Sequence, residues 1–219
     1  MGTSTLIDFR PYVYPEIPGV DIPTLDRNIK LTLIEFCEET WVLQKGVNFT
    51  IDVEDIDSEM SDSIIINLKG HFKYHRPFAI KQLRVDGTSW DLKYTEMINN
   101  STYINSIRET GCKVFEIFDL YSIRIAPFES ANEIYIQVVF KPLMDMTYVD
   151  DRLYYDWVEA IAAGAKWRLL NIPGKPWTNH QVAAGWGKVY RAYKSKARRK
   201  NIKQHSGMSQ SVYPREFGF

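Results

Sequence analysis

Apolar residues recur at helical spacing near both ends of the chain, and this pattern predicts three helices. The first spans about 24–43, with Thr24 as its N-cap and an apolar stripe that excludes Glu35, Glu38 and Glu39. The second spans about 150–171 and the third about 178–203. The stripe of the first helix consists of Leu25, Ile29, Leu33, Phe36 and Trp41.

Between residues 46 and 148 the pattern changes to short runs of β-branched and aromatic residues. Six or seven such runs predict strands of a β-sandwich or barrel-like insertion. Asp86-Gly87 predicts a hairpin turn, and residues 95–111 interrupt the series as a short helix or loop. Residues 6–23 contain four prolines and are predicted to be extended.

The segment between the second and third predicted helices combines stop and start signals. Pro173 and Pro176 surround Gly174 and end one helix. Thr178 and Gln181 match a capping box for the next helix. Trp177 and Val182 stand where a hydrophobic staple places its two partners. Before this joint, Ala160, Ala163 and Gly164 would let another element approach closely, which ordinary core packing also explains.

These elements predict an α+β protein in which an antiparallel helical bundle carries an inserted β-sandwich-like domain and an extended C-terminal arm. The bundle would comprise residues 1–45 and 149–204, and the insertion residues 46–148. The arm, residues 205–219, would be the docking segment.

Charge is neutral overall but unevenly distributed along the chain. Residues 1–187 contain 18 Lys and Arg against 26 Asp and Glu, whereas residues 188–219 contain 9 Lys and Arg and 1 Glu. Like charges in such a run repel one another unless an anionic surface lies near. The pattern therefore favours an acidic partner for the C-terminal end, although a solvated helix end is the simpler alternative.

The candidate partner-binding residues lie in that basic run and in the arm that follows it. The helix contributes the cations of the run, and the arm contributes aromatic residues of the kind that anchor interfaces. They are Lys196, Arg198, Arg199, Lys200, Lys203, Tyr213, Phe217 and Phe219.

Catalytic and cofactor motifs are absent from the sequence, which contains no nucleophile elbow, phosphate-binding loop or dinucleotide fingerprint. The acidic stretch 52–63 lacks the glycine and the glutamate that a calcium loop requires. His71 and His75 lie four apart on a predicted strand and loop, which is the wrong geometry for a shared metal. Cys37 and Cys112 form no disulfide or zinc pattern. We expect no enzyme, metal or cofactor, and neither a signal peptide nor a membrane span is predicted.

Three stretches in order resemble the head–tail connector adaptors of tailed bacteriophages, including the tubular tail protein A type. They are "PGVDIPTLDRNIKLTLIEFCEETWVLQ" (18–44), "YSIRIAPFESANEIYIQVVFKP" (121–142) and "DDRLYYDWVEAIAAGAKWRLLNIPGKPWTNHQVAAGWGKVYRAYKSKARRK" (150–200). The resemblance includes a Glu-Phe-Cys-Glu core, a strand ending in Lys-Pro, a Gly-Ala helix, a "KPW" joint and a final basic helix. Residues 52–110 and the C-terminal arm depart from the family pattern.

The resemblance implies a structural virion protein at the head–tail junction, assembled in the host cytoplasm. A ring of twelve copies would lie under the portal protein and surround the DNA exit channel. The C-terminal arm would dock against the portal, and other tail proteins (nozzle or tail tube) would be further partners.

Two other function classes stay open at this point. A non-specific nucleic-acid-binding module would use the basic C-terminal helix on phosphates, with steep salt dependence. An enzyme would need a pocket in the β-rich insertion, and the sequence offers no motif for one.

Overall fold

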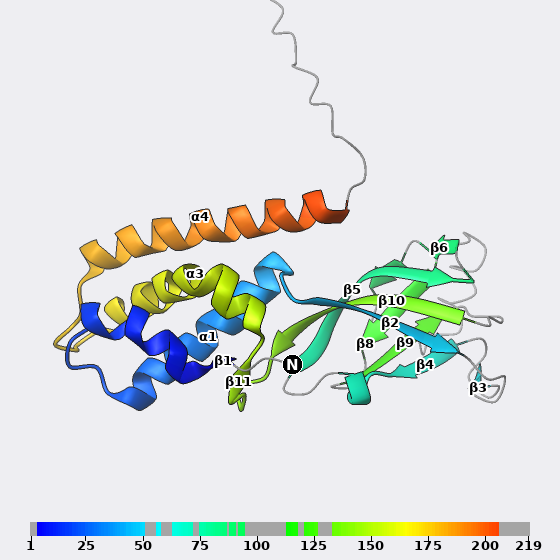
Figure 1. Cartoon of the computed structure of the whole chain (residues 1–219), viewed down its shortest axis with the longest axis horizontal. Helices are drawn as coiled ribbons and strands as arrows, with labels where there is room; N and C mark the ends of the chain where they lie inside the picture. The colour runs from blue at the N-terminus through cyan, green and yellow to red at the C-terminus, as the bar shows by residue number, and fades with distance from the viewer. Residues whose placement is uncertain are drawn as a thin grey trace, which may run out of the picture.

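The computed structural model describes residues 4–50, 56–57, 63–71, 75–86, 88–90, 92–94, 113–117, 121–126 and 133–205. Helices gather at one end of an elongated molecule and most strands at the other (Figure 1). The α-helices are α1 (Ile22–Thr40), α3 (Asp151–Leu170) and α4 (His180–His205). The 3-10 helices are η1 (Leu6–Tyr12), η2 (Tyr14–Glu16) and η5 (Lys69–His71).

The N-terminal segment is helical, so the prediction that it is extended was wrong. Its first turn is held by Asp8, whose carboxylate accepts hydrogen bonds from the Thr5 amide at 2.6 Å and the Thr5 hydroxyl at 3.0 Å. Proline fixes a backbone angle that also suits a 3-10 helix, so prolines alone did not separate the two conformations. The reason for helix here is burial at a spacing of three to four residues, at Leu6, Phe9, Val13 and Ile17.

Helix α1 keeps the predicted apolar stripe and shifts its ends. Asp21, not Thr24, is the N-cap, and its carboxylate accepts from the Thr24 amide at 2.8 Å. Pro23 lies in the first turn, where no amide hydrogen is needed. Trp41 ends the helix with a left-handed backbone at φ 55° and is 39% exposed, so it does not continue the stripe.

The strands of the described residues form three separate sheets. The first pairs β1 (Ser4–Thr5) with β11 (Tyr148–Val149) beside the helices. The second is antiparallel with the order β2 (Gln44–Thr50), β10 (Glu133–Pro142), β5 (His75–Val85) and β6 (Thr88–Trp90). The third has the order β3 (Ile56–Asp57), β4 (Ser63–Asn67), β9 (Ser122–Ala126), β8 (Lys113–Ile117) and β7 (Leu92–Tyr94).

The hairpin predicted at Asp86-Gly87 is confirmed. Val85 pairs with Thr88 across the antiparallel β5 and β6, and Asp86 has a left-handed φ of 47°. The Asp86 carboxylate also accepts from the Glu133 amide at 2.9 Å, which ties the turn to the start of β10. Residues 95–111, predicted as a short helix or loop, lie outside the described residues.

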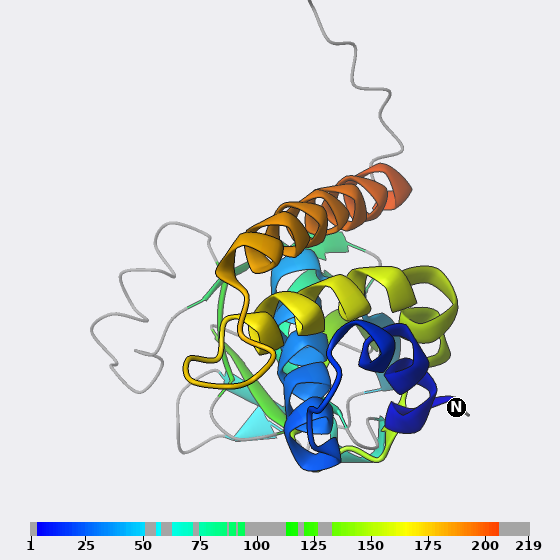
Figure 2. The same cartoon turned by 90° about the vertical axis from the view of Figure 1, so that its left-hand side faces the viewer.

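The chain fits the α+β class, but an antiparallel bundle with an inserted sandwich is the wrong architecture. Figure 2 shows α1 crossing α3 steeply instead of running beside it, and only α3 and α4 lie antiparallel. One small sheet, β1–β11, belongs to the helical end, and β7 pairs with β8 in parallel. Apolar spacing predicts which side chains are buried, but it does not set the angle between elements, so this error is of the expected kind. The predicted division into bundle, insertion and arm stays a prediction.

A single buried cluster connects the helical and sheet ends of the molecule. Phe36 of α1, Ile136 of β10 and Ile125 of β9 all belong to it and are fully buried. At the junction, Lys141 of β10 forms an ion pair with Glu38 of α1. Asp150 caps α3 by accepting from the Arg152 amide at 3.0 Å. These contacts fix α1 and α3 relative to the sheets, and α4 packs on those two helices.

Candidate partner-binding surface

Helix α4 lies along α3 and over the end of α1, forming one outer surface of the molecule (Figure 1). Its side chains at a spacing of three to four residues face the body. We call this the inner face of α4, and it consists of Ala183, Gly187, Tyr190, Lys194, Ala197 and Asn201. Within it, Tyr190 is 1% exposed and Ala183 is fully buried.

The contact between α3 and α4 depends on two reciprocal glycines. A Cβ added at Gly164 of α3 would lie 2.9 Å from the Tyr190 ring and 2.5 Å from Thr32 of α1. A Cβ at Gly187 of α4 would lie 3.1 Å from the Trp167 ring of α3. Each helix therefore offers a bare backbone where the other places an aromatic ring. The close approach expected at Gly164 is confirmed, whereas the matching role of Gly187 was not foreseen.

Three cations of the basic run form ion pairs with acids of the same chain. Lys194 Nζ lies 2.9 Å from Glu35 Oε1 and 2.8 Å from Glu39 Oε1, both on α1. Arg198 reaches Glu39 at 2.7 Å, and Lys200 reaches Asp156 of α3 at 3.2 Å. The anionic surface that the charge run requires is therefore, in part, the protein's own body.

Glu35 is the centre of this ion-pair network. Burial opposes its ionisation, but hydrogen bonds from Lys194 and Arg168 outweigh that effect and hold the pKa of the carboxyl below its ordinary value. Lys194 also lies 4.6 Å from the centroid of the Tyr190 ring, a cation–π distance. Burial raises the pKa of the Tyr190 phenol. Glu35 is therefore ionised and Tyr190 neutral around neutral pH.

Four other cations of α4 whose side chains are described point away from the body. They are exposed, and within the described part of the chain their side chains make no hydrogen bond or ion pair. Small side chains separate them on the same face of the helix, at Ala184, Gly185, Ala192 and Ser195. We call this surface the outer basic face, and its cations are Lys188, Arg191, Lys196 and Arg199.

The predicted partner-binding residues therefore separate into groups. Lys196 and Arg199 lie on the outer basic face, whereas Arg198 and Lys200 are exposed but paired with acids of the same chain. Lys203 lies in the last turns of α4, and its side chain is outside the described residues, as are Tyr213, Phe217 and Phe219. Lys188 and Arg191 belong to the same surface and to the basic run, but no sequence signal marked them as partner-binding residues.

The joint between α3 and α4 is a hydrogen-bonded corner. The Thr178 hydroxyl donates to the Ile172 carbonyl at 2.5 Å and accepts from the Lys175 amide at 3.0 Å. Gly174 has a left-handed φ of 71°, which permits the turn between the exposed Pro173 and Pro176.

The cap of α4 differs from the predicted capping box at Thr178. The helix begins at His180, and the Asn179 side chain accepts from the Val182 amide at 3.1 Å. Asn caps a helix at least as well as Thr, which leaves the Thr178 hydroxyl free to close the corner. Trp177 packs against the core while Val182 is 46% exposed, so the predicted staple between them is also wrong.

Candidate chemistry elsewhere in the described residues is limited. No group of three or more His, Cys, Asp or Glu side chains there could hold a metal ion. Cys37 is fully buried, and burial raises the pKa of its thiol, so it is not poised as a nucleophile. The helices of the described ranges are all too short or too polar to cross a membrane.

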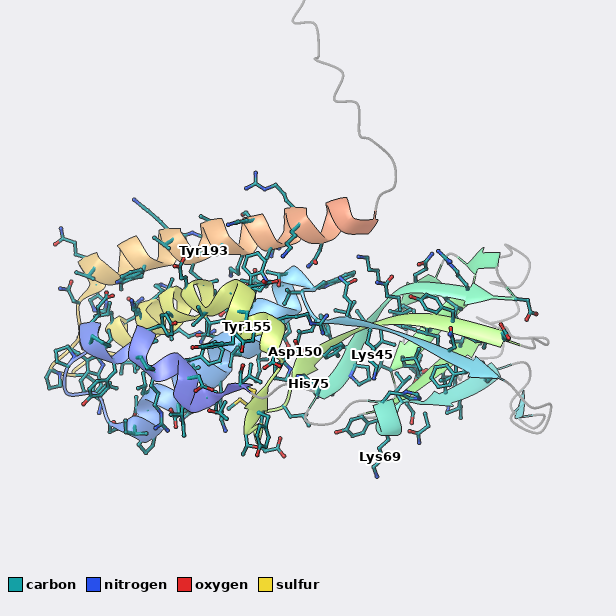
Figure 3. The ribbon with its side chains drawn as sticks, viewed as in Figure 1. Lys45, Lys69, His75, Asp150, Tyr155 and Tyr193 are labelled. Atoms are coloured by element: carbon teal, nitrogen blue, oxygen red, sulfur yellow. The ribbon has the colours of Figure 1, made fainter. Side chains whose placement is uncertain are left out.

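Exposed aromatic and apolar side chains around η1 were missed because residues 6–23 were expected to be extended. Ile7 and Tyr14 line a hollow of about 330 Å³ with Pro11, Pro15 and Ile22. Tyr155 on α3 is 74% exposed and is labelled in Figure 3. A helical periodicity at Leu6, Phe9 and Val13 was the available signal for this segment.

No protein-family model and no curated protein sequence matches this chain.

Proposed function

We propose that the chain is a structural virion protein, a head-to-tail adaptor that forms a ring between the portal and the tail of a tailed phage. The observation that carries the proposal is the outer basic face of α4. Four cations without an ion-pair partner among the described residues stand on a helix whose position is fixed by the glycine contacts and by the Thr178 corner. Such a surface suits a fixed macromolecular partner better than a small substrate. In the ring that the ordered resemblance in three stretches implies, that partner is the portal or a neighbouring copy of the chain.

The portal is the proposed partner for the C-terminal end of the chain. Tyr213, Phe217 and Phe219 would anchor the arm in grooves of the portal, because aromatic side chains dominate such contacts. The β-rich end would contact other tail proteins, and copies of the chain would surround the DNA exit channel. The proposal assigns the protein no catalytic role.

The direct test is binding to purified portal rings of the same virus. A chain truncated after Lys203 should keep its helical circular dichroism and thermal unfolding transition but lose portal binding. If the full-length chain fails to bind portal rings, the proposed function is wrong. If the truncated chain binds with full affinity, the role of the arm is wrong while the adaptor function stands.

A second candidate function is non-specific binding to duplex DNA, and the small residues between the four cations favour it. They would let a phosphate backbone approach the helix closely. Four phosphate contacts would give a slope of about −3.6 for log affinity against log salt concentration. Binding of random duplex DNA by the isolated monomer, measured at several salt concentrations, tests this. Tight binding with that slope supports the candidate, whereas weak binding at low salt excludes it.

A further inference from the structure

A second surface with a distinct composition lies on the helical end of the molecule. Four large side chains of η1, the residues after it, and α3 are exposed there, and we call them the tyrosine face. They are Ile7 (60% exposed), Tyr12 (42%), Tyr14 (45%) and Tyr155 (74%). Large exposed aromatic groups that cluster in this way mark interaction surfaces. Helix η1 packs against α3 on the side away from α4 (Figures 1 and 2).

The rings of this surface are held in fixed positions. The buried Phe9 lies 5.5 Å, centroid to centroid, from Tyr154, and Tyr154 lies 6.4 Å from Tyr12 and 5.4 Å from Tyr155. All three pairs meet edge to face. Such an arrangement costs little conformational entropy on binding because the rings are already positioned.

Two other members of the tyrosine face, Ile7 and Tyr14, line an apolar hollow whose one charge is neutralised within the chain. Arg10 lines the hollow with Ile7 and Tyr14, and its guanidinium donates two hydrogen bonds to Asp26 at 2.8 and 2.7 Å. The surrounding elements carry two acids without an ion-pair partner among the described residues, Asp8 on η1 and Glu159 on α3. Asp156 of α3 is not available in the same way, because it pairs with Lys200 of its own chain. The tyrosine face is therefore aromatic at its centre and acidic at its edge.

We propose that the tyrosine face binds the outer basic face of α4 from a second copy of the chain. The inference rests on the proposed ring function and names the surfaces through which neighbouring copies would meet. The two surfaces are complementary in charge, since residues 1–187 carry the excess of acids and residues 188–219 the excess of cations. The exposed Val182 and Val189 of α4 suit the apolar hollow.

The contact has a chemical precedent within the chain itself. Lysines already lie over aromatic rings in this chain, with Nζ 4.1 Å from the Trp186 centroid for Lys166 and 4.6 Å from that of Tyr190 for Lys194. Lys200 lies 5.7 Å from the Trp157 centroid. Cations of the outer basic face would make the same contact with Tyr12 and Tyr155 of the neighbour.

Geometry requires that the neighbour be another molecule. The inner face of α4 is packed on its own α1 and α3, so the outer basic face points away from its own body. An interface between two different surfaces of one chain is heterologous, and its repetition builds a ring or an open filament. Copies of this one chain can therefore cover both the tyrosine face and the outer basic face, without a different partner protein.

Complementation between two broken variants tests the pairing. Arg191→Glu/Lys196→Glu removes one surface, and Tyr12→Ser/Tyr155→Ser removes the other. Sedimentation velocity over a concentration series should show self-association of the wild-type chain, weakened about tenfold or more in each variant. An equimolar mixture of the variants should form dimers and nothing larger, because each dimer retains one intact interface. Lys69→Glu, on the β-rich end (Figure 3), is the control and should associate like the wild type.

A cysteine pair extends the test to chains bound on portal rings. Tyr155→Cys/Ala192→Cys should yield a ladder of disulfide-linked chains, whereas either cysteine alone should not. The inference is overturned if the charge and tyrosine variants associate like the wild type. It is also overturned if the wild type is monomeric at every concentration and the cysteine pair fails to cross-link on the portal. Portal binding without such cross-links would leave the adaptor function intact and remove only this interface.

Discussion

The two faces of α4 differ in what their cations do. On the inner face and its margin, Lys194 and Arg198 meet the carboxylates of Glu35 and Glu39. On the outer basic face, Lys188, Arg191, Lys196 and Arg199 meet no acid within the described residues. One continuous basic run in the sequence therefore contains structural charges and charges available to a partner. Only the position of each residue around the helix separates the two groups.

The largest expected difference concerns two neighbouring residues, Tyr190 and Val189. Tyr190 is 1% exposed between α1 and α3, and Val189 is 39% exposed. Tyr190→Ala should lower the free energy of unfolding by about 3–5 kcal/mol because it leaves a cavity. Val189→Ala should lower it by less than about 1 kcal/mol. Urea unfolding measures both, and equal effects would mean that α4 does not pack as described.

The next largest loss of stability is expected at Glu35, the acid that pairs with Lys194 of α4 and Arg168 of α3. Glu35→Gln should destabilise the protein by about 2–3 kcal/mol at neutral pH, because Lys194 and Arg168 lose their countercharge. Glu35 has a lowered pKa in the folded protein, so its contribution is complete above its ordinary value of 4.5 and is lost as pH falls through the lower folded value. The variant should therefore have a flatter acid limb in unfolding measured against pH. A variant with the wild-type pH profile would contradict the role of this carboxylate.

A smaller effect is expected from a comparison of two glycines, one at the contact between α3 and α4 and one on the outer basic face. Gly164→Ala should cost about 1–3 kcal/mol, because the new Cβ would overlap Thr32 and the Tyr190 ring. Gly185 has open space on the outer basic face, so Gly185→Ala should stabilise the protein by about 0.5–1 kcal/mol. Thermal unfolding of both variants would show shifts in opposite directions. Shifts in the same direction would contradict the close approach of α3 and α4.

The sequence predicted those features of the fold that depend on local spacing. Leu25, Ile29, Leu33 and Phe36 are fully buried because a period of 3.6 residues places them on one side of α1. Asp86 turns as predicted because its residue type tolerates the left-handed backbone. Proline fits both extended and 3-10 backbone, so the prolines of residues 6–23 could not separate the two conformations. Asn and Thr both cap helices well, so the sequence could not show that Asn179 and not Thr178 caps α4.

The candidate surface could be predicted only in part. The basic run was visible, but Lys194 and its partner Glu35 lie 159 residues apart in the chain. Spacing along α1 placed Glu35 and Glu39 off the apolar stripe without indicating which cations they meet. The tyrosine face depends on η1 packing beside α3, which is a tertiary contact that no local pattern encodes. The crossing of α1 over α3 was unpredicted for the same reason.

The most direct test of the division within α4 is the free energy of unfolding of Lys194→Ala compared with Lys196→Ala. The two lysines are two positions apart on one helix, and among the described residues Lys194 has ion-pair partners whereas Lys196 has none. We expect Lys194→Ala to cost about 2–3 kcal/mol and Lys196→Ala to change stability by less than about 0.5 kcal/mol. Equal costs for the two substitutions would contradict the separation of structural from partner-binding charges.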